Sequence, residues 1–169
     1  MHMYVAAIDA LPFPEDKKFH KRADVVLSGM RKLRAALTDA ADRNRSSPAV
    51  ILALRDVRRR YDDLMTRSAA APGSTLGQQL YATRIEARLS AQEGANGAGL
   101  TAELLDDLEA GEIPTEGEAA KVRDLIAALG GVPDTEHHQH PAPEHEQLEQ
   151  HEEHHVNGWD ESFVGDNTG

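Results

Sequence analysis

Apolar residues recur at alternating steps of four and three between Phe19 and Ala40, and this spacing constrains the fold more than any other feature of the chain. The same alternation returns between Val50 and Ser68. A repeat of 3.5 residues keeps a narrow apolar stripe on one side of a helix, facing a partner helix. We therefore predict two helices with a helix-docking or oligomer-forming seam made of Phe19, Val26, Met30, Leu33, Leu37, Leu54, Val57, Tyr61 and Leu64.

The ends of these two helices carry recognisable signals. Pro14 followed by two acidic residues is typical of a helix start, and Ser47 before Pro48 predicts an N-cap and first turn for the second helix. Only a short turn separates the two seams. We expect an antiparallel helical hairpin.

Further helices are expected after the hairpin. Thr75 with Gln78 forms a capping-box pattern for a third helix reaching about Gln92, and its apolar residues face two directions, which predicts contact with two neighbours. Thr101, and then Thr115 with Glu118, begin two shorter helices. The chain is predicted to be all-α, with an apolar N-terminal arm (1–14), a three-helix core containing the heptads (15–93), a Gly-rich linker (94–100), an acidic helical hairpin (101–131) and a disordered acidic His-rich tail (132–169).

Charge is distributed very unevenly along the chain. Residues 17–60 carry 13 basic and 4 acidic side chains, whereas residues 134–169 carry 10 acidic and no basic ones. Four arginines of the second helix, Arg55, Arg58, Arg59 and Arg60, are candidate phosphate ligands, with an ordinary solvated helix face as the alternative. Nucleic acid is therefore a possible partner, beside protein partners.

Residues 100–129 resemble the helix-extended-helix motif of SAP-type DNA-binding modules, with residues 113–117 at the bend. The resemblance covers about 30 residues and implies DNA binding. However, residues 93–124 hold 9 acidic and 2 basic side chains, a balance that repels a phosphate backbone. A small acidic docking unit, or a structural cap on the main bundle, is the better interpretation.

Composition excludes several classes of protein. The absence of cysteine from the sequence excludes disulfides, thiol nucleophiles and thiolate metal sites. No apolar run is long enough to span a membrane, and the first residues lack the cationic flank of a signal peptide. We expect a protein of the cytoplasm, or one inside a virion, with no membrane partner.

One segment of the tail resembles a sequence pattern found in a class of enzymes. His151 to Glu161 resembles the metzincin pattern of zinc peptidases, which implies a hydrolase with His151, His155 and a third ligand on zinc and with Glu152 as base. Glu161 stands where the third histidine belongs, and no methionine follows Met65 to form the family's methionine turn. The sequence favours weak, adventitious binding of zinc or nickel at His151, His155 and Glu161, and no cofactor is expected.

Trp159 and Phe163, four residues apart, are the large apolar side chains of the acidic tail. This pattern favours a short anchor that docks on a partner protein. We expect a non-enzymatic helical assembly or adaptor protein, a homo-oligomer or part of a larger particle such as a phage head, connector or tail. The alternatives are a DNA-associated packaging or regulatory subunit and, less favoured, a metal-dependent hydrolase.

Overall fold

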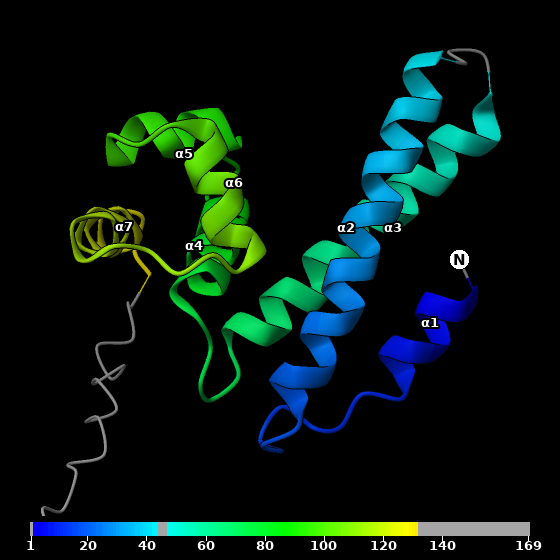
Figure 1. Ribbon diagram of the computed structural model, residues 1–169, viewed down its shortest axis with the longest axis horizontal. Coiled ribbons are helices and arrows are strands. Elements are labelled where there is room, and N and C mark those ends of the chain that lie inside the picture. Colours follow the sequence, from blue (N-terminus) through cyan, green and yellow to red (C-terminus); the bar gives the residue numbers. More distant parts are fainter. Residues whose placement is uncertain (1, 44–46, 132–169) are drawn as a thin grey trace, which may run out of the picture. The chain divides into compact units, whose positions relative to one another are not determined.

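A computed structural model describes residues 2–43 and 47–131 of the 169-residue chain. Within these ranges the chain is all-α, as predicted (Figure 1). The helices are α1 (His2–Asp9), α2 (Phe19–Arg43), α3 (Pro48–Ala69), α4 (Leu76–Glu86), α5 (Ala91–Ala98), α6 (Ala102–Ala110) and α7 (Glu116–Ala128). None of the helices described is long and apolar enough to cross a membrane. The tail (132–169), with the predicted anchor Trp159 and Phe163 and the predicted metal ligands His151, His155 and Glu161, lies outside the described residues.

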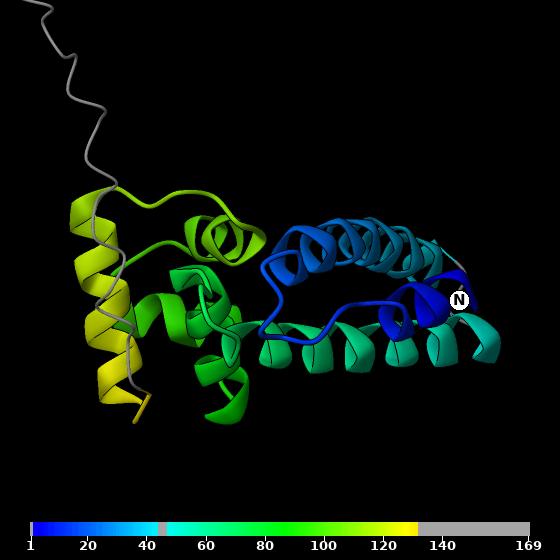
Figure 2. The ribbon, with the colours of Figure 1, turned by 90° about the horizontal axis from the view of Figure 1, so that it is seen from below.

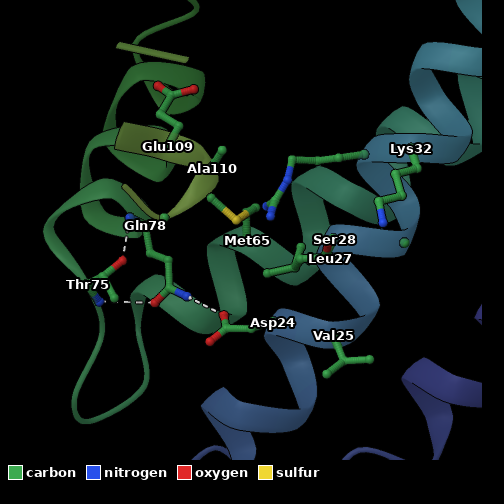
Figure 3. Close-up of a pocket in the computed structure, with 13 residues that line it drawn as sticks. Asp24, Val25, Leu27, Ser28, Lys32, Met65, Thr75, Gln78, Glu109 and Ala110 are labelled. Atoms are coloured by element: carbon green, nitrogen blue, oxygen red, sulfur yellow. Dashed lines mark hydrogen bonds between the residues drawn. The ribbon is translucent and has the colours of Figure 1, made fainter. Parts of the chain in front are cut away.

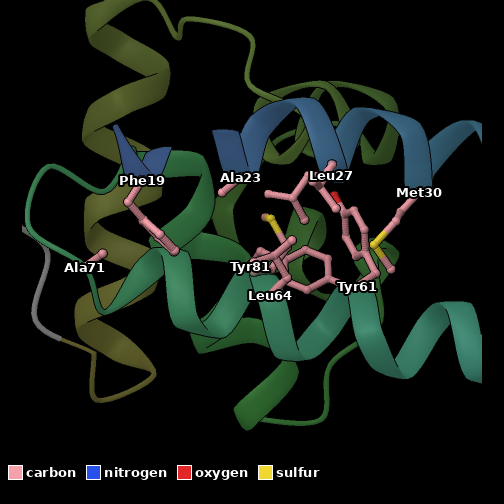
Figure 4. Close-up of a cluster of buried hydrophobic side chains, with 10 residues drawn as sticks. Phe19, Ala23, Leu27, Met30, Tyr61, Leu64, Ala71 and Tyr81 are labelled. Atoms are coloured by element: carbon pink, nitrogen blue, oxygen red, sulfur yellow. The ribbon is translucent and has the colours of Figure 1, made fainter. Parts of the chain in front are cut away.

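Helices α2 and α3 form the predicted hairpin, and its seam residues pack against each other within one chain. Figure 4 shows Phe19, Leu27 and Met30 of α2 facing Tyr61 and Leu64 of α3 in a core that also takes in residues of α4. Leu54 and Val57 are buried as well, whereas Leu33 and Leu37, nearer the α2–α3 turn, are only half-buried. The seam therefore serves helix docking inside the chain, and its buried half is not an open surface.

Within the N-terminal arm, His2–Asp9 form α1, which packs on this hairpin (Figure 2). Tyr4 and Ile8 of α1 contact the core formed by α2 and α3. An ideal Cβ at Gly29 would lie 2.8 Å from the ring of Tyr4, so a glycine is needed for this close approach. Gly29, an unfavourable residue inside a helix, thus allows α1 to dock.

Of the two predicted helix starts in the hairpin, the first is wrong and the second is right. Pro14 does not begin the first helix: residues 14–18 form turns, the Asp16 carboxylate accepts a hydrogen bond from the Lys18 backbone N–H at 2.8 Å, and α2 begins at Phe19. Ser47 is the N-cap of α3 as predicted, although its side chain makes no capping hydrogen bond.

The predicted third helix and the linker after it also differ from the structure. The third helix stops at Glu86 because Arg88 adopts a left-handed conformation with φ of 58°. Residues 94–100 are not a flexible linker, since most of them lie in α5, which starts at a capping box between Ser90 and Glu93. The glycines of this segment have structural roles: Gly94 is buried against the side chain of Arg84, and Gly99 ends the helix at φ of 62°.

A second core joins α4, α5, α6 and α7. Its buried residues are Leu80, Ala95, Leu105, Leu108, Val122, Leu125 and Ile126. Residues 101–131 therefore do not build a core by themselves, because α6 and α7 share theirs with α4 and α5. Tyr81 of α4 belongs to the first core and Leu80 to the second, which confirms that this helix has two sets of neighbours.

The contact between α4 and α6 predicts a strong effect of one added methyl group. A Cβ at Gly77 would lie 2.0 Å from the Leu108 carbonyl oxygen, a backbone atom that cannot move without separating the helices. We expect Gly77→Ala to lower the free energy of unfolding by about 1–3 kcal/mol, measured by urea denaturation. Gly117→Ala is the matched control, because Gly117 is also the second residue of its helix and its Cβ would meet nothing within 4 Å. Equal stability of the two variants would contradict the close contact.

The capping boxes of α5 and α7 predict a pH dependence at low pH. Hydrogen bonds from the Ser90 side chain and backbone lower the pKa of Glu93, and those from the Thr115 backbone and side chain lower the pKa of Glu118. A carboxyl whose pKa is lower in the folded state stabilises the fold above its unfolded value of 4.5, and this contribution is lost as the pH falls through the folded value. NMR titration of the Glu118 carboxyl carbon should give a midpoint below 4.5.

Glu118→Gln keeps a hydrogen-bond acceptor but cannot ionise. The protection factors of the amides in the first turn of α7, which are corrected for the intrinsic pH dependence of exchange, should then no longer fall below pH 4.5 as they do in the wild type. A Glu118 midpoint at or above 4.5 would refute this assignment.

Candidate functional site

Two clefts open where α2 faces α4 and α6. We call the one of about 640 Å³, which includes Asp24 and Gln78, the first cleft, and the one of about 950 Å³, which includes Arg34 and Tyr81, the second cleft. Arg31 and Glu109 line both of them. Both clefts follow from the fold, because the α2–α3 hairpin and the second core meet mainly through α4.

The first cleft is organised by one glutamine (Figure 3). Gln78 accepts a hydrogen bond from the Thr75 backbone N–H at 3.1 Å, as part of the α4 capping box, and its side-chain amide donates to the Asp24 carboxylate at 3.3 Å. Burial raises the pKa of Asp24, although the nearby His20 and Arg31 oppose the shift. This contact fixes the beginning of α4 against α2.

The second cleft contains a chain of aromatic and charged side chains. The Tyr81 hydroxyl donates to the Asp62 carboxylate at 2.6 Å, and its ring meets the Tyr61 ring edge-on with centroids 5.4 Å apart. Burial and the hydrogen bond to Asp62 raise the pKa of Tyr81 far above its usual range, so it stays a neutral donor. The guanidinium of Arg34 lies 4.9 Å from the centroid of the Tyr61 ring, a cation–π distance, and Arg31 donates to the Tyr61 hydroxyl at 3.3 Å.

A buried ion pair closes the inner end of the second cleft. Arg84 Nε and Nη2 donate to the two carboxylate oxygens of Glu109 at 2.7 and 2.6 Å, and the two side chains are only 7% and 5% exposed. Burial raises the pKa of Glu109, and the hydrogen bonds and charge of Arg84 oppose this shift. Burial alone would lower the pKa of Arg84, but the hydrogen bonds and charge of Glu109 raise the pKa of Arg84 overall. The pair holds α4 on α6 in one orientation, since a bidentate contact fixes an angle as well as a distance.

The chemistry of the second cleft suits recognition of a charged ligand. Helices α2 and α3 contribute Arg34 and Arg58 as well as three aspartates, and α6 contributes Asp106, so both charge signs face the same space. Within the described ranges, no three histidine, aspartate or glutamate side chains are grouped to hold a metal ion.

The four candidate phosphate ligands are not on one surface. Arg55, Arg58 and Arg59 are exposed on α3, with Arg55 at 3.9 Å from Asp56, whereas Arg60 is half-buried and lines a cavity beside α1. The structure thus brings together three of the four.

Sequence reasoning missed both members of the buried ion pair. Arg84 lies between Leu80 and Tyr81 on the α4 helical wheel, and Glu109 follows the buried Leu108 and lies four residues after the buried Leu105. The periodicity therefore placed both charges on buried faces. Charged residues are usually solvent-facing, so a charge on an apolar face is not by itself a signal of a buried ion pair.

Residues 4–75 match the MSMEG_6518_N family, described as an N-terminal domain. The match runs from α1 to the N-cap of α4 and so includes the whole α2–α3 hairpin. An uncharacterized protein of Mycolicibacterium smegmatis (strain ATCC 700084 / mc(2)155) is 56% identical over 129 residues, which are 76% of this chain and 100% of that relative. No solved structure matches the chain.

Removing one partner of the buried ion pair should be strongly destabilising. Glu109→Ala leaves the Arg84 guanidinium buried without its counter-charge, and we expect a loss of about 3–5 kcal/mol in the free energy of unfolding, measured by urea denaturation. Glu116→Ala, which removes the 91%-exposed partner of Arg123, should cost less than about 1 kcal/mol.

The double variant Arg84→Met with Glu109→Leu removes both charges and should be milder than Glu109→Ala alone. A Glu109→Ala variant no less stable than Glu116→Ala would show that the pair does not hold α4 on α6.

Proposed function

We propose that this chain, which belongs to the MSMEG_6518_N family, acts as a non-enzymatic helix-docking adaptor. The observation that carries the proposal is an apolar pair on the outer face of α3, where Ile51 is 54% and Leu52 52% exposed. The family match includes this helix. The bacterial relative gives no support to the narrower expectation of a phage particle, so the proposal is confined to docking.

The outer face of α3 combines apolar and cationic groups. Leu52, Arg55 and Arg59 follow each other at steps of three and four, which places them on one side of the helix, opposite the buried Val57 and Leu64. Arg55 is 74% exposed. We call this surface, made of Ile51, Leu52, Arg55, Arg58 and Arg59, the α3 outer face.

This combination fits an acidic amphipathic helix. Two apolar side chains on such a helix would cover Ile51 and Leu52, and its carboxylates would meet the arginines on either side. A helix laid here would extend the two-helix packing to three helices.

Phosphate binding is the second candidate, because Arg55, Arg58 and Arg59 stand together on the same face. Binding of DNA through several phosphates would fall steeply between about 50 and 200 mM salt and would not need the apolar pair. The two functions therefore differ in their dependence on Leu52.

The test uses the full chain with a photo-crosslinking amino acid at position 52, exposed to a lysate of M. smegmatis. The captured segment is then synthesised, and its affinity is measured by fluorescence anisotropy. We expect an acidic amphipathic segment whose affinity falls about 10-fold or more with Leu52→Glu and with Arg55→Glu plus Arg59→Glu.

The matched control is Ile113→Glu, which changes a 90%-exposed apolar residue of the α6–α7 loop and should leave binding unchanged. A segment without acidic and apolar patterning, or binding indifferent to Leu52→Glu, would refute the proposal. Crosslinking of position 52 to a second copy of this chain would show that the α3 outer face mediates self-association and does not bind a different protein. Salt-sensitive binding of a 20-base-pair duplex, unaffected by Leu52→Glu, would favour the DNA function.

A further inference from the structure

A small cavity lies between α1 and α3, apart from both clefts and from the α3 outer face. Its volume is about 180 Å³, and it is lined by Ile8, Arg60, Asp63, Leu64 and Arg67. Two of these five side chains are arginines, in a space partly walled by apolar groups. A guanidinium in such surroundings needs hydrogen-bond acceptors more than one in water does.

Three guanidinium nitrogens of these arginines are buried without an acceptor among the described residues: Nε and Nη2 of Arg67 and Nε of Arg60. Asp63 is the nearest candidate in sequence, being four residues before Arg67 and three after Arg60. In the part of the chain that the structure describes, it forms no ion pair with either arginine. No described residue satisfies these three donors, and an oxyanion that entered the cavity would satisfy them once the two arginine side chains turned toward it.

The Arg84 side chain shows what the same donors do when they meet an oxyanion. Its Nε and Nη2, which form one edge of the guanidinium, bind both oxygens of Glu109 at 2.7 and 2.6 Å. Arg67, which lines the cavity, carries the same two donors, and neither has an acceptor among the described residues. Its guanidinium also lies 5.3 Å from the centroid of the Phe19 ring, which limits the orientations that it can take.

Arg60 and Arg67 are placed to act together. They are seven residues apart on α3, which is close to two full turns, so both point to nearly the same side of the helix and are separated by roughly 10 Å along its axis. The cavity lies between them, beside Asp63 and Leu64. Two long side chains can reach one ion from such positions.

We propose that Arg60 and Arg67 bind a phosphate ion in this cavity. Donors on two separate guanidinium groups suit a tetrahedral oxyanion, whose oxygens point in several directions, better than a planar carboxylate, which one arginine edge saturates. Asp63 opposes the anion by its charge. Ile8 forms the wall on the side of α1, so the bound ion also helps to hold α1 on the hairpin.

The test is isothermal titration calorimetry of the full chain with inorganic phosphate at constant ionic strength. We expect saturable binding with one site per chain, weakened at least 10-fold by Arg67→Gln and strengthened by Asp63→Asn. Arg67→Lys keeps the charge but lacks the bidentate edge and should also bind more weakly. Arg123→Gln, on a half-buried α7 arginine that does not line the cavity, is the matched control and should bind phosphate as the wild type does.

A second measurement on the wild type does not depend on whether the variants fold. The NMR signal of the Ile8 methyl group in the wild type should move on titration with phosphate and saturate together with the heat. Absence of saturable binding to the wild type, or equal weakening by Arg67→Gln and Arg123→Gln, would overturn the proposal. Acetate binding as tightly as phosphate would overturn the choice of ligand, because it would assign the site to carboxylates.

Discussion

Arg84 and Glu109 place two opposite charges almost entirely out of water, and much of the structure depends on this contact. Ionised side chains are tolerated in such a position only when they are paired and hydrogen-bonded, so the position of α4 determines that of α6. Arg84 also donates to the Leu89 carbonyl oxygen at 2.9 Å, beyond the end of α4. One side chain thereby links α4, the turn that follows it and α6.

Helix α4 has this central role because it belongs to both cores. Tyr81 packs in the first core and donates to Asp62 of α3, whereas Leu80 packs in the second. The two clefts lie on either side of this junction and share Arg31 and Glu109. Most of the polar contacts described for the clefts therefore hold helices together. The cavity beside α1 shares no lining residue with the clefts, and the α3 outer face shares only Arg58 with the second cleft.

Local patterns predicted much of the helical structure correctly. Thr75 with Gln78 and Thr115 with Glu118 form capping boxes in the structure, and Gly111 ends α6 in a left-handed conformation. The errors arose where a competing local signal was given too little weight. Ser90 and Glu93 have the spacing of a capping box, whereas the glycines that follow have the composition of a linker. In the structure Gly94 packs under Arg84 and Gly97 packs against Leu125, so both glycines are part of a helix.

The sequence by itself determined that this chain is helical in the described residues, where most of its helices begin and which face of α2 and α3 is apolar. Periodicity and capping act over a few residues, so they can be read locally. Only the tertiary structure decided that the seam is buried within one chain, that Arg84 meets Glu109 and that Arg67 lies beside α1. The reason is physical: the cost of burying a charge or a seam depends on which distant residue lies opposite, and that is set by packing.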